Sequence, residues 1–414
     1  MQAVPKINLE RLLDRLNRLA AFGAGNPRGV TRLALSEEER HARDQVVAWM
    51  SALGLLVEID AIGNIFATRR GRHPLPPVMT GSHIDSVANG GHLDGPLGIL
   101  AGIEVLETLN ERNIETDRPL TVAVFTNEEG VRFSPDMMGS LVYSGGFPLE
   151  EALEKVGIDG VKLGTALQQI GYAGHHQPGF KIPASFVELH IEQGPVLEAE
   201  GCTIGAVTDL LGISWQELEI TGQANHAGTT PLPLRHDAGY VAARINVFVR
   251  QMAQAMGGSQ RATCGRIQHY PNLINVIPGR VTLTVDLRNH LEDKLQEAES
   301  RLAAFLTELA LQEGVSISSR RLVRFQPVRF DRGIAATIRG VAEAQGYSVR
   351  EMTSGAGHDA QMMTRLCPAA MIFVPSINGV SHNPAEATAD RDLEAGANVL
   401  LETMLRLATE SSPP

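Results

Sequence analysis

The chain has 414 residues, of which 43% are hydrophobic and 20% are charged, a balance typical of a globular protein with two or three domains. Its formal net charge of −11 argues against nucleic acid as a partner, because polyanions are bound by basic surfaces. The three cysteines, Cys202, Cys264 and Cys367, form no CxxC pair, which predicts buried, reduced thiols in a cytoplasmic protein.

The first predicted element is an amphipathic helix near the N-terminus. Apolar residues recur there at helical spacing, with charged residues between them: Leu9, Leu12, Leu13, Leu16 and Leu19. A secretory leader would need a continuous apolar run instead, so none is expected. No run in the chain reaches the roughly 18 apolar residues of a membrane span, and we expect no membrane partner.

The first half of the chain alternates extended and helical patterns. A helix is predicted over 95–112, and strands are predicted over 76–83, 120–130 and 185–194. This alternation predicts an α/β fold with a mixed, largely parallel sheet and helices on both of its faces. Ligands collect beyond the carboxyl ends of the strands in such sheets, and polar residues follow each of these strands.

From about residue 211 the pattern changes. The segment 280–289 alternates cleanly, with its apolar residues on one face and its polar residues on the other. Further strands are predicted over 214–223 and 315–324, and helices over 237–257 and 291–314. This order predicts an α+β domain of the split βαβ, ferredoxin-like kind.

After about residue 329 the first pattern resumes. A helix is predicted over 333–346, a strand over 369–376, and a closing helix from Leu393. One domain is therefore expected to comprise 1–210 and 329–414, with 211–328 inserted into it as a second domain.

Metal-capable side chains gather at the ends of the predicted strands. The stretch GSHIDSVANGGHLDG (81–95) alone holds two histidines and two aspartates. A hydrolytic metal site needs imidazoles and carboxylates from several strand ends, together with a base. The candidates are His83, Asp94, Glu128, Glu129, His190 and His382. A lone histidine is more often structural, but several at successive strand ends favour a metal site.

Each candidate also has a plainer interpretation. Asp85 follows His83 by two residues, so its carboxylate either fixes the histidine tautomer or caps a turn. Asp94 precedes a predicted helix and either caps it or bridges two cations. One member of the pair Glu128–Glu129 can bind metal while the other acts as a base; the alternative is a solvated acidic turn.

Six motifs then indicate a family. They are GSHIDSVANGGHLDG, NEEGVRF, ELHIEQGPVLE, NHAGTTP, SGAGHDA and GVSHNPAE. Together, and in this order, they resemble the dinuclear-metal amidohydrolases of the M20 peptidase clan, and within it the hydantoinase/carbamoylase family. That family includes N-carbamoyl-L-amino acid hydrolases, β-ureidopropionases and allantoate amidohydrolases. The match extends over nearly the whole chain.

The resemblance implies a role for each candidate at the metal centre. One divalent cation would be held by His83, Asp94 and His190. A second would be held by Asp94, Glu129 and His382, so that Asp94 bridges. Glu128 would be the general base. The usual metal of the family is zinc, with manganese, cobalt or nickel as substitutes, and the mixed imidazole and carboxylate ligands agree with it.

The resemblance also implies residues that bind the substrate. His226 would contact the reacting carbonyl from the partner subunit of a homodimer. Arg288 would bind the carboxylate of the substrate, although a surface salt bridge is an equally simple interpretation of this arginine. Gln193, Asn275 and the pair Gly357–His358 match substrate-binding positions.

The expected activity is hydrolysis of the carbamoyl (ureido) group of N-carbamoyl-L-amino acids to the amino acid, carbon dioxide and ammonia. The alternatives within the clan are an allantoate amidohydrolase, a β-ureidopropionase, and a peptidase or N-acyl amino acid hydrolase. A small-molecule binder without catalysis is less favoured, because a binder has no use for a free carboxylate such as Glu128 beside two metals.

Overall fold

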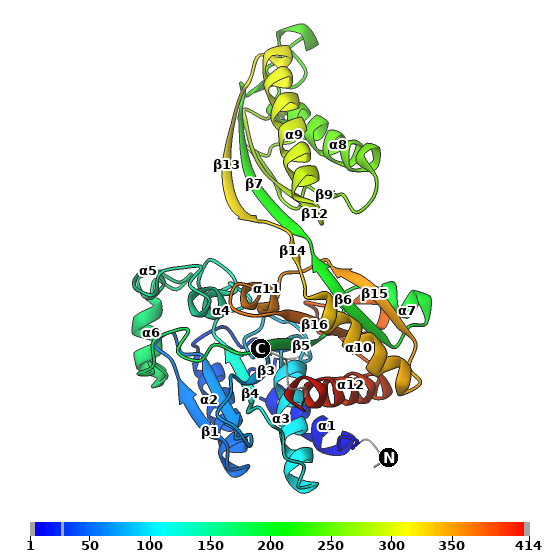
Figure 1. Cartoon of the computed structure of the whole chain (residues 1–414). Coiled ribbons are helices and arrows are strands. Elements are labelled where there is room, and N and C mark those ends of the chain that lie inside the picture. The colour runs from blue at the N-terminus through cyan, green and yellow to red at the C-terminus, as the bar shows by residue number, and fades with distance from the viewer. Residues whose placement is uncertain (1–4, 26–28, 410–414) are drawn as a thin grey trace. The chain divides into compact units, whose positions relative to one another are not determined.

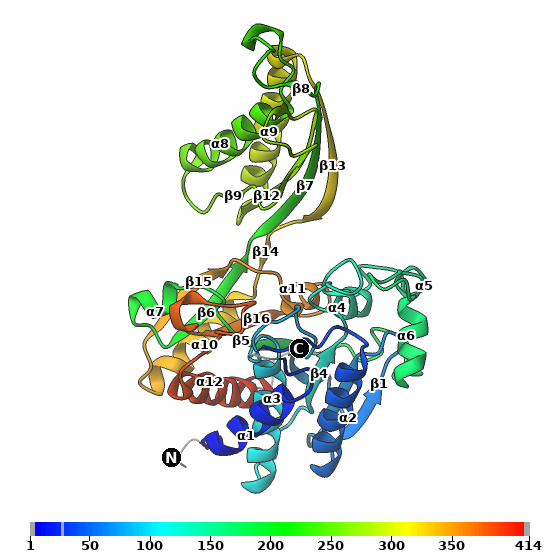
Figure 2. The ribbon, with the colours of Figure 1, turned by 180° about the vertical axis from the view of Figure 1, so that it is seen from behind.

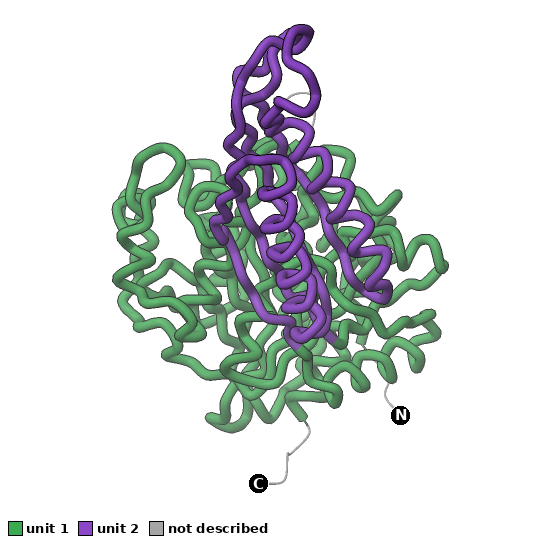
Figure 3. Tube along the Cα trace, turned by 90° about the horizontal axis from the view of Figure 1, so that it is seen from above, with its two compact units in different colours: residues 1–208, 329–414 green, residues 209–328 purple. Residues whose placement is uncertain are grey.

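The computed structural model describes residues 5–25 and 29–409. The chain divides into two compact units (Figure 3). The first unit contains the residues up to Thr208 and those from Arg329 onward, and the second contains Asp209–Val328.

The first unit is built on a mixed nine-stranded sheet (Figures 1 and 2). Its strand order is β1-β2-β4-β3-β5-β16-β6-β14, and β15 pairs with β6. The four central strands, β4, β3, β5 and β16, run parallel to one another. The strands comprise β1 (Leu56–Ile59), β2 (Ile65–Arg69), β3 (Val78–His83), β4 (Leu120–Phe125), β5 (Ser185–Ile191), β6 (Ile204–Leu210), β14 (Val328–Arg329), β15 (Val349–Ser354) and β16 (Ala369–Val374).

Helices cover both faces of this sheet, as expected. Helices α3 (Pro96–Glu111) and α12 (Asp390–Thr409) pack on β3 and β5 from one side. The short helices α4 (Met138–Tyr143) and α11 (Asp359–Met363) lie on the other. The remaining helices are α1 (Leu9–Ala20), α2 (Glu37–Ala52), α5 (Leu149–Leu153), α6 (Leu163–Ile170), α7 (Val196–Glu200), α10 (Arg332–Ala344) and the 3-10 turn η2 (Ile377–Gly379).

Two of the central strands end earlier than their sequence patterns predict. The strand predicted over 120–130 stops at Phe125, and the one predicted over 185–194 stops at Ile191. Asn127 and Gln193 each have a φ of 57°, in the left-handed region that no strand allows. The acidic and polar residues that follow therefore lie in turns above the sheet edge.

The second unit is an antiparallel five-stranded sheet with two helices. Its order is β10-β12-β7-β13, β9 pairs with β12, and a separate ribbon joins β8 to β11. The elements are β7 (Gly212–Thr221), β8 (Asn225–His226), η1 (Leu232–Leu234), α8 (Ala238–Met256), β9 (Arg261–Thr263), β10 (Ile267–Tyr270), β11 (Val276–Ile277), β12 (Arg280–Asn289), α9 (Glu292–Glu313) and β13 (Ser316–Phe325).

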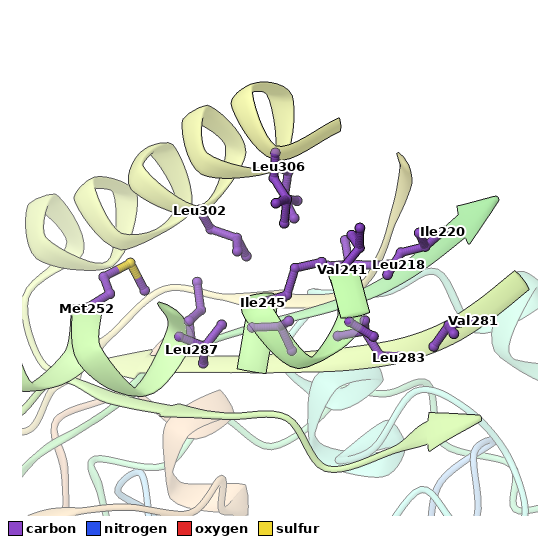
Figure 4. Close-up of a cluster of buried hydrophobic side chains, with 14 of the residues drawn as sticks. Leu218, Ile220, Val241, Ile245, Met252, Val281, Leu283, Leu287, Leu302 and Leu306 are labelled. Carbon is purple, nitrogen blue, oxygen red and sulfur yellow. The ribbon is translucent and has the colours of Figure 1, made fainter. Parts of the chain in front are cut away.

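The core of the second unit lies between its sheet and its helices (Figure 4). The apolar face of β12, including Leu283 and Leu287, packs against Ile245 from α8 and Leu302 from α9. Its polar face, which carries Arg288, is left outside this core. The alternation in the sequence thus separates a packing face from a face that can bind ligand.

Two expectations from composition concern membranes and thiols. Over residues 5–25 and 29–409, the longest apolar helices fall short of what crossing a membrane requires.

All three cysteines are free thiols. Cys367 is buried, whereas Cys202 and Cys264 are only partly buried, because both lie on loops near the surface.

Candidate metal centre

The parallel strands bring the predicted metal-capable residues to one edge of the central sheet. His83 is the last residue of β3, and His190 is the penultimate residue of β5. Glu128 and Glu129 follow β4, and His382 follows β16. Because β4, β3, β5 and β16 are parallel, all four chain segments leave the sheet at the same edge.

Asp94 lies at the centre of this group, just before α3. Its Oδ1 is 3.1 Å from Nε2 of His190 and 3.8 Å from Nε2 of His83. Its other oxygen, Oδ2, is 3.2 Å from Nε2 of His382, which in turn lies 3.6 Å from Glu129. The donor atoms thus form two groups, His83–Asp94–His190 and Asp94–Glu129–His382, each within 4.8 Å.

Backbone contacts fix which nitrogen of each buried imidazole faces the centre. Nδ1 of His83 lies 3.0 Å from the carbonyl oxygen of Asp85, and Nδ1 of His190 lies 2.9 Å from that of Ile191. Each Nδ1 therefore carries a hydrogen, which leaves Nε2 as the nitrogen that can bind a cation after it loses its proton. Nε2 of His190 makes no hydrogen bond although a carboxylate oxygen of Asp94 is 3.1 Å away. A cation between them would satisfy both.

The electrostatics of the cluster also favour cations. Contact with Asp94 raises the pKa of His382 to about 9. Burial by itself would raise the pKa of Asp94, but the imidazoles of His190 and His382 outweigh it and hold that pKa well below its usual value. The group thus attracts positive charge, and protons and divalent cations compete for the same atoms.

Glu128 is buried beside the cluster without belonging to either group of donors. Its Oε2 lies 3.5 Å from Nε2 of His83. Burial raises the pKa of Glu128 well above its usual value, and the neighbouring carboxylate of Asp359 adds to the effect. A carboxylate with a raised pKa next to a hydrolytic centre is suited to accept and return a proton.

Asp85 hydrogen-bonds a turn, which is one of the two roles that the sequence left open, and its side chain also lies close to His83. Its carboxylate is 3.6 Å from Nδ1 of His83, whose hydrogen meets the backbone carbonyl of Asp85 instead. The two carboxylate oxygens accept the backbone N–H groups of Glu128 at 3.1 Å and Glu129 at 3.2 Å. Asp85 therefore orders the turn that carries both glutamates.

A glycine next to Asp94 is required by the packing around His83. Gly95 has a φ of +83°, and a Cβ atom there would lie 2.5 Å from the His83 ring. Any larger residue would displace the imidazole. The glycine richness of the 81–95 stretch thus has a steric cause at this position.

Two of the predicted substrate-binding segments of the first unit lie against the cluster. Nε2 of Gln193 donates to Oδ2 of Asp94 at 2.7 Å. His358 is buried with its ring centroid 4.4 Å from that of His190, and burial holds its pKa well below its usual value. His358 is thus a neutral imidazole, and it follows Gly357 at the start of α11.

The other predicted substrate-binding residues belong to the second unit. His226 and Asn275 share one ribbon, in which Ala227 donates to the carbonyl of Asn275 at 3.0 Å. Nδ1 of His226 accepts the N–H of Gly228 at 3.0 Å, so the neutral ring carries its hydrogen on the exposed Nε2. Arg288 pairs with Asp286 at 2.9 Å on the polar face of β12.

Sequence reasoning missed a set of buried polar residues around the centre. Glu386 accepts the backbone N–H of Asp94 at 3.2 Å and the hydroxyl of Ser381 at 2.9 Å. Glu188 accepts the hydroxyl of Ser82 at 2.7 Å, next to His190. Glu386 lies in the SHNPAE stretch with His382, so an acid four residues after a candidate ligand was the available signal.

Comparison with known sequences defines the class of protein to which this fold and site belong. Residues 79–406 match the peptidase family M20/M25/M40. The chain belongs to this family, whose members generally depend on two metal ions, and it is a hydrolase that acts on amide C–N bonds.

Individual relatives narrow the comparison to amidohydrolases. The chain is 40% identical to an N-carbamoyl-L-amino acid amidohydrolase of Geobacillus stearothermophilus, over 96% of this chain and 98% of the relative. It is 38% identical to an allantoate amidohydrolase of Bacillus subtilis, over 96% of this chain and 97% of that relative. Among solved structures, a hydantoinase/carbamoylase family amidase of Burkholderia multivorans is 42% identical, with a TM-score of 0.94 over 98% of this chain and 99% of that one.

Proposed function

We propose that the chain hydrolyses the carbamoyl group of N-carbamoyl-L-amino acids, releasing the amino acid, carbon dioxide and ammonia. One observation carries the proposal: the two oxygens of Asp94 face different imidazoles, His190 at 3.1 Å and His382 at 3.2 Å. This is the arrangement that a carboxylate bridging two cations requires. The similarity to amidohydrolases with this activity supports the choice of substrate.

In this proposal, His83, Asp94 and His190 hold one divalent cation, and Asp94, Glu129 and His382 hold the other. Imidazole and carboxylate ligands without thiolate suit zinc, and also manganese, cobalt or nickel. Bound there, such cations lower the pKa of water and polarise a carbonyl oxygen.

Glu128 moves the proton. Its carboxylate takes a proton from the attacking water as the water oxygen bonds to the ureido carbon. The same carboxyl group then returns the proton to the nitrogen of the departing amino acid. The carbamate that is released breaks down to carbon dioxide and ammonia. The raised pKa of Glu128 suits this exchange, because the carboxyl group must hold the proton between the two steps.

The second unit supplies the remaining contacts in the proposal. Its Arg288 binds the substrate carboxylate and its Asn275 orients the substrate, together with Gln193, Gly357 and His358 of the first unit. His226 donates its Nε2 hydrogen to the ureido carbonyl oxygen, which gains negative charge when water attacks the carbon. The unit acts as lid and dimerisation domain, so that His226 reaches the site of the partner subunit in a homodimer.

An allantoate amidohydrolase is the second candidate. The 38% identity to the Bacillus subtilis allantoate amidohydrolase favours it, since that identity falls within the 33% to 40% identity to the N-carbamoyl-L-amino acid amidohydrolases. Allantoate also carries a carboxylate and ureido groups, so the same side chains would serve it.

A substrate panel separates these possibilities. N-carbamoyl-L-amino acids, N-carbamoyl-β-alanine, allantoate and dipeptides are incubated with enzyme reloaded separately with zinc, manganese, cobalt or nickel, and the release of ammonia and amine is measured. We expect the highest kcat/KM with an N-carbamoyl-L-amino acid. A higher value with allantoate or N-carbamoyl-β-alanine would replace the assigned substrate, and turnover of dipeptides alone would refute ureido hydrolysis.

A further inference from the structure

The buried carboxylate of Glu386 joins the two loops that meet at the centre of the metal cluster. Glu386 is only 4% exposed. Its Oε1 accepts the backbone N–H groups of Leu93 at 3.0 Å and Asp94 at 3.2 Å. Its Oε2 accepts the hydroxyl of Ser381 at 2.9 Å. One side chain thus connects the backbone of Asp94 to the residue that precedes His382.

Ser381 also lies next to the carboxylate of Asp94. Its Oγ lies 3.3 Å from Oδ2 of Asp94, the oxygen that faces His382. The single hydroxyl hydrogen goes to the nearer acceptor, Glu386. His382 itself has a φ of +54°, a conformation that the surrounding loop must hold in place. The hydrogen bonds of Glu386 are contacts that can hold that loop.

The glycines of the 81–95 stretch provide an independent observation. A Cβ atom on Gly91 would lie 2.1 Å from Oε1 of Glu386 and 2.2 Å from its Cδ. Only glycine leaves room for the carboxylate at this place. The sequence thus contains both the buried acid and the space that admits it, although the two are far apart in the chain.

We propose that Glu386 is a positioning residue that holds the loop of His382 against the backbone of Asp94. The ligands of the second cation are then already positioned when that cation binds. The inference rests on the proposed metal centre. Partners behind the ligands of a metal typically change its affinity by about 10- to 100-fold. The cation shared by Asp94, Glu129 and His382 is expected to be affected more than the one at His83 and His190.

The test uses three variants of the full chain and one control. Glu386→Ala removes the carboxylate, Glu386→Gln keeps an oxygen that can accept the two backbone N–H groups, and Gly91→Ala displaces the carboxylate without changing it. Glu402→Ala is the control, because Glu402 is a buried acid, 8% exposed, that contacts Gln345 and Arg406 instead of the metal cluster.

Cobalt affinity is measured by competition with a chelating dye, and the cobalt absorption spectrum reports ligand geometry. We expect Glu386→Ala and Gly91→Ala to bind the second cobalt about 10- to 100-fold more weakly with an altered spectrum. Glu386→Gln should stay within a few-fold of the wild type, and Glu402→Ala should match it even if its melting temperature falls. Glu386→Gln and Gly91→Ala keep the test decisive if Glu386→Ala fails to fold.

Wild-type cobalt affinity and spectrum in both Glu386→Ala and Gly91→Ala would overturn the inference. An equal loss in Glu402→Ala would also overturn it, because the effect would then reflect general stability. A wild-type chain that binds fewer than two cations would refute the metal centre of the proposed function, which is a distinguishable result, and the inference would fall with it.

Discussion

The carboxylate of Asp85 accepts the backbone N–H of Glu128 at 3.1 Å and that of Glu129 at 3.2 Å. One aspartate on the loop after β3 therefore orders the turn after β4. The two glutamates that this turn carries are the proposed base and a proposed metal ligand. Their separate environments thus depend on a residue that need not contact either substrate or metal.

Replacing Asp85 by alanine should lower kcat by about 10- to 100-fold, because the turn that carries Glu128 and Glu129 loses both of its hydrogen bonds to this carboxylate. Asp85→Asn should be intermediate, since its amide offers one oxygen to the two N–H groups. Steady-state kinetics with saturating metal measure the effect. Unchanged kcat in a folded Asp85→Ala variant would show that the turn keeps its conformation without the hydrogen bonds to Asp85.

Glu128→Gln should retain two bound metal ions per chain but lose kcat by about 10²- to 10⁴-fold, because the amide cannot take a proton from water. Metal content by elemental analysis and single-turnover kinetics measure the two properties. Glu129→Gln is the matched comparison and should lose metal as well. Turnover by Glu128→Gln at the wild-type rate would refute its assignment as the base.

Removing the metal ions with a chelator should abolish turnover and lower the melting temperature by several degrees, because clustered carboxylates such as Asp94 and Glu129 then lack a counter-charge. Adding zinc back should restore both. Asp94→Ala provides the control, since its melting temperature should no longer respond to the chelator. A wild-type melting curve that the chelator leaves unchanged would contradict the metal centre.

Arg288→Lys should raise KM for carboxylate substrates by about tenfold or more and change kcat less, because lysine cannot make the two parallel hydrogen bonds of a guanidinium. Arg320→Lys on β13 is the control, as Arg320 pairs with Glu217 in an ordinary exposed contact. If both variants show the wild-type KM, the salt bridge to Asp286 is the whole role of Arg288.

Two cysteines should resist alkylation near neutral pH. Burial raises the pKa of Cys264 to about 11 and that of Cys367 to about 12, so both are thiols at pH 7. Because the thiolate is the reactive form, their reaction with iodoacetamide should increase about tenfold per pH unit between pH 7 and 10. Peptide mass spectrometry measures the rate of alkylation at each cysteine, and the rate in the unfolded chain is the reference. Equal rates in folded and unfolded protein at pH 7 would contradict the burial.

The sequence is sufficient to predict an element or a site residue where a single local pattern determines the structure. The segment 280–289 forms a strand with the same bounds because its alternation separates the core face from the polar face. His83 and His190 were placed at strand ends because apolar runs precede them. By contrast, the contacts of Asp85 and Glu386 are hydrogen bonds between distant loops, which periodicity does not encode. The early end of β4 depends on the left-handed backbone of Asn127, which also left no signal.

The order in which the chain is synthesised has a consequence for when this enzyme can gain its metals. The proposed ligands His83, Asp94 and His190 precede the second unit in the chain, whereas the proposed ligand His382 follows both that unit and β16. The second unit and the last central strand must both be made before the second group of ligands is complete. A chain that stops short of β16 could therefore supply only the first group of proposed ligands, and the second group needs the residues that follow that strand.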